Sequence, residues 1–222
     1  MGKLFVIDGT DGSGKQTQFK KLMERLEKEG IKYKSVSFPN YESESSSLVK
    51  MYLSGEFGTD PKTVSPYVAS TFYAVDRFAT YQKELKDFYE NGGIILADRY
   101  ITANMVHQAG KIKDQEERNK FLNWVWDLET NIYGLPKPDE VFFLNMPPKN
   151  SLELIKDRDN KYSHNNIKDI HERNAEHIKD AYDAACYVSK KYNWFEIQCV
   201  KDDKIRTIED IHNEIYSKLN LG

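Results

Sequence analysis

The sequence predicts an α/β protein in which helices flank a parallel sheet. The first observation is a series of short apolar runs, four of them clear and the last less regular, at 4–7, 33–38, 94–97, 141–144 and 194–200. Continuous apolar runs of this length are typical of strands that are buried on both faces. The second observation is that longer charged stretches separate the runs, and strands that alternate with helices form parallel sheets through right-handed crossovers.

The charged stretches carry apolar residues at helical spacing. In the first of them, over 18–30, Phe19, Leu22 and Leu26 share one face and Gly30 ends the pattern. The other stretches expected to be helical are 66–91, 115–130, 150–158, 168–191 and 207–219. The polar stretch 157–169 (DRDNKYSHNNIKD) is the best candidate for a mobile loop or lid.

Composition and charge limit the class of protein. The 222 residues, 39% of them hydrophobic, suffice for one sizeable core, so we predict a single domain over 1–222. The net charge of −3 shows no basic excess, and we expect neither a nucleic-acid partner nor a membrane partner. Cys186 and Cys199 are too few for a disulfide framework, which favours reduced thiols and a cytoplasmic location. No apolar run is long enough to span a bilayer.

The stretch Gly9–Lys15 (GTDGSGK) has the spacing of a phosphate-binding loop. It follows the first apolar run and precedes the first helical one, which is the strand–loop–helix order that the motif requires. Glycines let successive amides turn towards phosphate oxygens, while the helix start and the lysine add positive charge. A glycine-rich turn with an ordinary surface lysine is the alternative. The residues predicted to bind ATP phosphates are Gly9, Thr10, Asp11, Gly12, Ser13, Gly14, Lys15, Gln16 and Thr17.

Position 16 departs from the usual loop, in which Ser or Thr follows the lysine and ligates Mg²⁺. Thr17 cannot simply replace it, because one residue along a helix rotates the side chain by about 100 degrees. Gln16 offers a neutral amide oxygen on a longer stem, which is an acceptable ligand for Mg²⁺. Alternatively, a water molecule takes this ligand position and Asp98 is the main protein ligand of Mg²⁺. We expect a working loop that uses Mg²⁺, with the choice between these ligands open.

The apolar run at 94–97 ends in Asp98 and Arg99. An aspartate at a strand end beside a phosphate loop can hold Mg²⁺, directly or through water. Arg99 supplies a planar, permanently charged group for phosphate oxygens. The alternative is an ordinary salt bridge at the strand end. A guanine-binding Asn-Lys-x-Asp signature is missing, since the stretch 160–163 reads NKYS, and this disfavours a GTPase.

Five sequence elements together resemble the thymidylate kinase family in order and spacing, over nearly the whole chain. They are Gly9–Thr17, Phe38-Pro39, Tyr73–Arg77, Asp98-Arg99-Tyr100 and Gly134–Asp139 (GLPKPD). The resemblance implies transfer of the γ-phosphoryl group of ATP to dTMP, with Mg²⁺, in a homodimer. It also implies a five-stranded parallel sheet flanked by helices, of the phosphate-loop nucleoside monophosphate kinase type with a short lid.

The resemblance further implies roles for individual residues. Asp11 would contact the deoxyribose 3′-hydroxyl, Tyr73 would stack on thymine, and Arg77 would hydrogen-bond the base. Phe72 is the neighbouring candidate for stacking if the register differs by one residue. The implied acceptor site consists of Asp11, Phe38, Tyr41, Phe72, Tyr73, Arg77, Arg99, Asn104, His107 and Gln108. The implied catalytic residues are Lys15, Arg99, Asp11 and Arg158, and the lid at about 157–169 would carry the cations Arg158 and Lys161.

Tyr41 is a departure from the family, which commonly has an arginine there to bind the phosphate of the acceptor. Tyrosine is uncharged at neutral pH, so either Arg77 and Arg99 share that task or the acceptor is not dTMP. Discrimination between dTMP and dUMP depends on packing that the sequence does not reveal. The phosphate loop also lacks an arginine, so Arg158 or Lys161 would have to neutralise the transferred phosphate.

Two other functions compete with a dTMP kinase. A deoxynucleoside kinase needs a base for the 5′-hydroxyl near the end of the second strand, where this chain reads Ser35-Val-Ser-Phe38 without an acid. A catalytically reduced nucleotide-binding protein is favoured by Gln16 and Tyr41 and disfavoured by the presence of Lys15, Asp98 and Arg99.

Overall fold

The computed structural model describes residues 1–60, 62–161 and 175–221, and the side chains of all of these except 156–161 and 175–177. Its centre is a five-stranded sheet of order β2-β3-β1-β4-β5 in which every neighbouring pair is parallel. The strands are β1 (Lys3–Asp8), β2 (Tyr33–Ser37), β3 (Ile94–Asp98), β4 (Glu140–Asn145) and β5 (Phe195–Gln198). The predicted α/β fold with a five-stranded parallel sheet flanked by helices is therefore confirmed.

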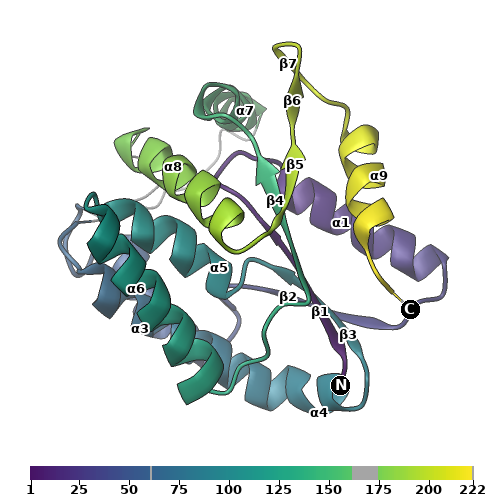
Figure 1. The fold of residues 1–222 in the computed structure, drawn as a ribbon, viewed down its shortest axis with the longest axis horizontal. Coiled ribbons are helices and arrows are strands. Elements are labelled where there is room, and N and C mark those ends of the chain that lie inside the picture. The colour runs from purple at the N-terminus through teal and green to yellow at the C-terminus, as the bar shows by residue number, and fades with distance from the viewer. Residues whose placement is uncertain (61, 162–174, 222) are drawn as a thin grey trace.

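Helices cover both faces of this sheet (Figure 1). They are α1 (Lys15–Lys28), α2 (Ser47–Ser54), α3 (Pro66–Thr80), α4 (Lys86–Glu90), α5 (Ile101–Ala103), α6 (Gln115–Asp127), α7 (Pro148–Lys161), α8 (Ala175–Lys191) and α9 (Ile208–Lys218). Short 3₁₀ or π-helical turns extend several of them, namely η1 (Glu44–Ser46), η2 (Tyr81–Leu85), η3 (Asn104–Gln108), η4 (Ala109–Lys111) and η5 (Leu128–Ile132). The turn η2 joins α3 to α4, so the predicted helical stretch 66–91 is confirmed as one continuous helical segment.

The two faces of the sheet carry two separate hydrophobic cores, because side chains alternate along each strand. Phe5 and Ile7 of β1 point to one face and pack with residues of α1 and α9, including Leu22 and Ile215. Leu4 and Val6 point to the other face, where residues of α6 and α8 cover them. The same division is visible in Figure 1, where α1 and α9 lie together on one side of the strands.

Some elements differ from their predicted bounds. The predicted strand 194–200 is shorter, because after Gln198 the chain enters a separate hairpin of β6 (Val200–Lys201) and β7 (Lys204–Ile205). The helical segments 44–54 and 101–111 were not predicted. In α2 only Val49 and Tyr52 are buried, so the apolar pattern is too short to be recognised. In η3 the buried residues include Asn104 and Gln108, which breaks the apolar period.

The Gly134–Asp139 motif (GLPKPD) ties the entry of β4 to the neighbouring elements. The Tyr100 hydroxyl donates to the carbonyl oxygen of Pro136 at 3.1 Å. The backbone amide of Leu4 donates to Asp139 Oδ2 at 2.7 Å, and the amide of Asp139 donates to Leu4 O at 2.9 Å. The motif therefore fixes the start of β1 against the start of β4, and it also fixes the turn that follows β3. These contacts give the motif a structural role in the fold.

The predicted lid falls only partly on described residues. The backbone of 157–161 continues helix α7, so this part of the predicted loop is helical, and 162–169 lie outside the described residues. In the described part of the chain, the helices lack the combination of length and apolar character that a membrane crossing requires.

Candidate active site

The phosphate loop connects the carboxyl end of β1 to the start of α1. Gly14 caps the helix with φ 86°, a left-handed conformation that suits glycine. Gly12 has φ +74°, and a Cβ atom there would lie 2.5 Å from the carbonyl oxygen of Ser151. Gly14 is thus required by its backbone conformation and Gly12 by its conformation and its close packing, as the phosphate-loop prediction expects.

Lys15 lies across the inside of this loop and is almost completely buried. Its Nζ donates to the carbonyl oxygens of Gly9 at 2.7 Å and Thr10 at 2.8 Å. Burial and then the charge of Arg99 lower the pKa of Lys15 to about 8, although nearby carboxylates oppose the change. The ammonium is therefore held at the centre of the loop and titrates close to neutral pH.

Asp8, at the end of β1, holds the start of the phosphate loop. It was not predicted as a site residue. Its side chain is fully buried and accepts hydrogen bonds from the amide of Gly9 at 2.7 Å and from the hydroxyl of Thr102. Burial raises the pKa of Asp8, although Thr102 and Lys15 counteract this. The only signal in the sequence was an acid at the end of an apolar run, whereas its partner Thr102 lies 94 residues away.

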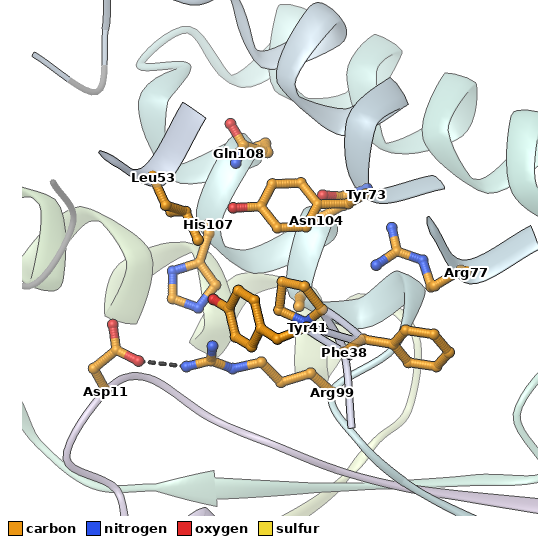
Figure 2. A pocket seen from close by; sticks show the side chains of 12 residues that line it. Asp11, Phe38, Tyr41, Leu53, Tyr73, Arg77, Arg99, Asn104, His107 and Gln108 are labelled. Atoms are coloured by element: carbon orange, nitrogen blue, oxygen red, sulfur yellow. Dashed lines mark hydrogen bonds and ion pairs between the residues drawn. The ribbon is translucent and has the colours of Figure 1, made fainter. Parts of the chain in front are cut away.

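Asp98 and Arg99 leave β3 directly beside the loop, since Asp98 pairs with Ile7 in the parallel register. Arg99 has φ 64°, and its amide donates to Ile7 O at 3.0 Å, so the chain turns sharply at the strand end. The Arg99 guanidinium forms an ion pair with Asp11 of the loop, drawn as a dashed line in Figure 2. Asp98 and Arg99 therefore lie beside the phosphate loop at the carboxyl ends of the strands.

The Asp11–Arg99 pair fixes the charge of both groups. Burial would raise the pKa of Asp11, but the charges of Arg99 and Lys15 outweigh it and hold that pKa well below its usual range. Burial likewise opposes the charge on Arg99, yet Asp11 and Asp98 raise the pKa of Arg99 above its ordinary value. A carboxylate and a permanently charged guanidinium therefore stand next to the phosphate loop.

Two adjoining cavities meet at this pair. The first is a cleft formed by residues 11–17 of the loop, Asp98, and Leu154 and Ile155 of α7. The second is a pocket between α3, η3 and the segment after β2 (Figure 2). The residues that line both are Asp11, Phe38, Pro39, Tyr41 and Arg99. A ligand in the cleft and a ligand in the pocket would therefore approach each other at Asp11 and Arg99.

The pocket brings together most of the predicted acceptor residues. The remaining lining residues are Leu53, Tyr73, Arg77, Ala103, Asn104, His107 and Gln108. Phe72, the alternative candidate for stacking on the base, does not line the pocket. Its ring packs instead on Tyr52 and Phe57, with centroid distances of 6.4 Å and 5.7 Å. Tyr73, one residue further along α3, faces the pocket instead (Figure 2).

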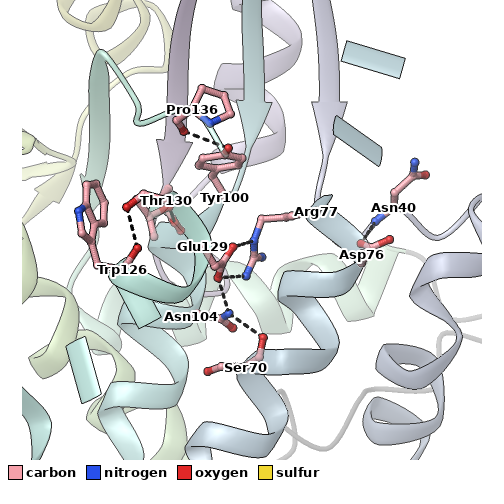
Figure 3. A network of polar contacts seen from close by, with 12 residues as sticks. Asn40, Ser70, Asp76, Arg77, Tyr100, Asn104, Trp126, Glu129, Thr130 and Pro136 are labelled. Carbon is pink, nitrogen blue, oxygen red and sulfur yellow. Dashed lines mark hydrogen bonds and ion pairs between the residues drawn. The ribbon is translucent and has the colours of Figure 1, made fainter. Parts of the chain in front are cut away.

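Arg77 is held by a buried carboxylate that was not predicted, Glu129 of η5 (Figure 3). Nε and Nη2 of Arg77 donate to Glu129 at 2.6 Å and 2.7 Å, and both side chains are at most 1% exposed. Burial opposes the charge on Arg77, but the carboxylate of Glu129 raises its pKa above the ordinary value. Sequence reasoning could not find Glu129, because it lies 52 residues from Arg77 in a stretch that reads simply as helix.

Asp76, the neighbour of Arg77, fixes the segment that carries Tyr41. Its carboxylate accepts hydrogen bonds from the amide of Asn40 at 2.8 Å and from the hydroxyl of Ser45 at 2.7 Å. Tyr41 is half-exposed at the place where the cleft and the pocket join. The tyrosine that replaces the expected arginine is thus directed to the junction of the two cavities.

The residues around the cleft fit a single Mg²⁺ ion held mainly by a nucleotide. Oδ1 of Asp98 is buried and has no hydrogen-bond partner among the described residues, and Gln16 lines the same cleft. The described part of the chain contains no cluster of three or more His, Cys, Asp or Glu side chains that could hold a metal alone. Mg²⁺ is usually bound by one or two protein oxygens together with phosphates and water, so one carboxylate is enough.

The residues predicted as lid cations, Arg158 and Lys161, follow Leu154 and Ile155 in the sequence of α7. The backbone of Arg158 and Lys161 belongs to α7, but their side chains are outside the described part of the chain. Their assignment to the transferred phosphate stays a prediction.

The position of the Lys15 pKa predicts how ATP affinity depends on pH. Because the pKa is lowered to about 8, the ammonium loses its proton as the pH rises through that value, and its attraction for phosphate is lost. We expect the Kd for a non-transferable ATP analogue to rise above that pH by up to about tenfold per pH unit. Calorimetric titration from neutral pH to about pH 9.5 measures this. A Lys15→Arg variant keeps its charge, so its Kd should not change over this pH range. If affinity declines equally in both proteins, a group other than Lys15 causes the pH dependence.

Comparisons with known proteins agree with this geometry. The family model described as thymidylate kinase matches residues 7–215. The thymidylate kinase of Plasmodium falciparum is 28% identical over 221 residues, which cover 98% of this chain and 90% of that protein. The probable thymidylate kinase of Thermococcus gammatolerans is 29% identical over 217 residues, 97% of this chain and 94% of that protein. Because the family model spans nearly the whole chain, the protein belongs to the thymidylate kinase family.

Proposed function

We propose that this protein is an ATP-dependent dTMP kinase that transfers the γ-phosphoryl group of ATP to dTMP and gives dTDP and ADP. The product is a precursor of dTTP and of DNA. The observation that carries the proposal is the junction of the two cavities at Asp11 and Arg99. The cleft has the shape and charge for a triphosphate, and the pocket combines an aromatic face with directional polar groups.

In the donor cleft, the loop amides and the Lys15 ammonium bind the phosphates of ATP. Residues 9–17 all belong to the loop or the first turn of α1, whose positive end adds to the attraction. Bound Mg²⁺ would neutralise phosphate charge, held by Asp98 with Gln16 or a water beside it. The buried position of Lys15 strengthens its electrostatic effect, because the surroundings screen it less than water does.

In the acceptor pocket, Tyr73 stacks on the thymine ring, Phe38 walls it, and Arg77 donates a hydrogen bond to it. His107 and Asp11 both line the pocket, and the charge of His107 helps to lower the pKa of Asp11. We assign both residues to the sugar of the acceptor. Arg99 then reaches the acceptor phosphate at the junction. The acceptor is already an anion, so alignment and charge neutralisation suffice and no strong base is required.

The reaction is tested by a coupled ADP-release assay with ATP and Mg²⁺, in which dTMP, dUMP and thymidine are offered in turn. We expect turnover with dTMP and none with thymidine. Lys15→Ala and Arg99→Ala should each lower kcat/KM by about 10³-fold or more, because Lys15→Ala removes a cation from the phosphates of ATP and Arg99→Ala removes one from the acceptor phosphate.

The surface residues Lys21 and Arg25 of α1 provide matched controls, since Lys21 pairs with Glu209 and Arg25 with Glu29. Lys21→Ala and Arg25→Ala should leave turnover unchanged. Turnover with thymidine alone would indicate a deoxynucleoside kinase. ATP binding without turnover of any acceptor would indicate a catalytically reduced nucleotide-binding protein.

The proposed role of Gln16 beside Mg²⁺ predicts the effect of restoring the usual residue. In Gln16→Thr a short hydroxyl replaces a longer, exposed amide, and we expect the Mg²⁺ concentration for half-maximal activity to fall several-fold without loss of kcat. Titration of activity with Mg²⁺ measures this, and Thr17→Ser is the neighbouring control. A folded but inactive Gln16→Thr protein would show that Gln16 has another function.

We further propose that the protein is a homodimer that associates through α3. Val68, Val75 and Phe78 lie along one side of this helix and are between 38% and 48% exposed. Phe78 contacts Tyr133 at a ring-centroid distance of 5.4 Å, and the nearby Ile132 is 68% exposed, so the apolar surface continues onto η5. A contiguous exposed apolar surface of this kind is typical of a protein–protein interface.

The dimer proposal predicts that a charge in the middle of this surface separates the subunits. We expect the wild-type protein to run as a dimer in size-exclusion chromatography with light scattering, and Val75→Asp to run as a monomer. Ile208→Asp, at another exposed apolar residue on α9, is the control and should remain dimeric. A dimeric Val75→Asp protein would contradict the proposed interface.

We propose a cytoplasmic location, and its support is that the two cysteines are too few for a disulfide framework. Cys186 and Cys199 are both free thiols, and Cys199 is buried. Burial raises the pKa of Cys199 to about 12, so this thiol is unreactive at neutral pH. The absence of a nucleic-acid partner stays a prediction from the net charge.

A further inference from the structure

Glu129 touches two residues of the acceptor pocket without lining the pocket itself. It is fully buried, and its Oε1 accepts hydrogen bonds from Nη2 of Arg77 at 2.7 Å and from Nδ2 of Asn104 at 3.1 Å. Its Oε2 accepts from Nε of Arg77 at 2.6 Å. Figure 3 shows the side chains of Arg77 and Asn104 meeting at the carboxylate of Glu129, and Asn104 also donates to the carbonyl oxygen of Ser70 at 3.2 Å.

These contacts fix which atoms Arg77 and Asn104 can offer to a ligand. Arg77 uses the Nε–H and one N–H of Nη2 for Glu129, which leaves the two N–H groups of Nη1 and the second N–H of Nη2 as donors. The amide nitrogen of Asn104 is used by Glu129 and Ser70, which leaves Oδ1 as an acceptor. The amide cannot turn over, because its oxygen would then face a carboxylate and a carbonyl oxygen.

We propose that Glu129 is a positioning residue that sets the hydrogen-bonding polarity of the pocket, with a donor at Arg77 and an acceptor at Asn104. This pair matches a pyrimidine with a 4-keto group and an N3–H, which is the pattern of thymine and uracil. The same donor and acceptor do not fit cytosine. Its 4-amino group would face the donor of Arg77, and its unprotonated N3 would face the acceptor of Asn104. The proposal rests on the proposed function in one respect, namely that this pocket takes the base of the acceptor.

The burial of the pair supports this role over a purely stabilising one. A buried ion pair contributes little net stability, because desolvation of the two charges offsets most of their attraction. It does hold both partners in one geometry, and a site built to hydrogen-bond one pattern strongly rejects a ligand that leaves its polar groups unpaired. A neutral side chain at position 129 would accept fewer hydrogen bonds and would let the Asn104 amide turn over.

The test is the ratio of dissociation constants for dCMP and dTMP, measured by calorimetry, together with KM and kcat for dTMP and ATP. We expect wild-type protein to prefer dTMP and Glu129→Gln to lower that preference at least tenfold. The change should appear in the Kd and KM for dTMP and leave the KM for ATP unchanged. Glu117→Gln, an exposed carboxylate on α6, is the matched control and should keep the preference.

Loss of Glu129 leaves Arg77 buried without its partner, so a second variant covers the case in which Glu129→Gln fails to fold by circular dichroism. Asn104→Ala keeps the Arg77–Glu129 pair and removes the acceptor, together with the amide nitrogen that donates to Glu129 and Ser70. It should lower the same ratio at least tenfold with a native far-ultraviolet spectrum. A merely structural role would weaken dTMP and dCMP equally, so an unchanged ratio in the folded variants overturns the proposal. Absence of dTMP turnover by wild-type protein would instead overturn the proposed function, while the binding ratio would still test Glu129.

Discussion

The register between β1 and β3 is the constraint on which the rest of the site depends. Ile7 lies opposite Asp98, so the phosphate loop leaves one strand beside the point where Arg99 leaves the next. The amide of Phe38 donates to Asp98 O at 3.0 Å, which ties the exit of β2 to the same edge. Three chain segments that carry the donor loop, the arginine and the wall of the pocket therefore meet where parallel strands end, the usual place for ligands in such sheets.

This convergence concentrates charge in a poorly hydrated place. Lys15 and Arg99 face the carboxylates of Asp8, Asp11 and Asp98, and buried charges are tolerated only when they are paired. The mutual repulsion of the two cations remains and contributes, after burial, to the lowered pKa of Lys15. An anionic phosphate between them relieves that repulsion, so the arrangement favours phosphate over neutral ligands and favours it more as charge accumulates during transfer.

The fold and the phosphate-loop part of the site were predictable because their signals are local in the sequence. Apolar runs marked all five strands, and the loop motif together with Asp98 and Arg99 stands next to two of them. What was missed depends on contacts between distant residues. Thr102 and Glu129 act through partners 94 and 52 residues away, and neither belongs to a pattern of its own. The choice between Phe72 and Tyr73 was also open, because adjacent helical residues differ by about 100 degrees and only packing decides which one faces the pocket.

The two arginines of the site are engaged in different ways, which bears on how the protein manages without an arginine at position 41. The side chains of Arg77 and Glu129 are paired and only 1% and 0% exposed. If Arg77 turned to bind a phosphate, the buried carboxylate of Glu129 would be left unpaired. Arg99 and Asp11 are 27% and 17% exposed, and an incoming phosphate can share that guanidinium without stranding a buried charge. We therefore infer that Arg99 alone supplies the charge for the acceptor phosphate, that Tyr41 adds a hydroxyl at the junction, and that Arg77 serves only the base. In this inference Arg99, which can exchange Asp11 for a phosphate, acts in catalysis, and Arg77, which stays paired with Glu129, acts in recognition of the base.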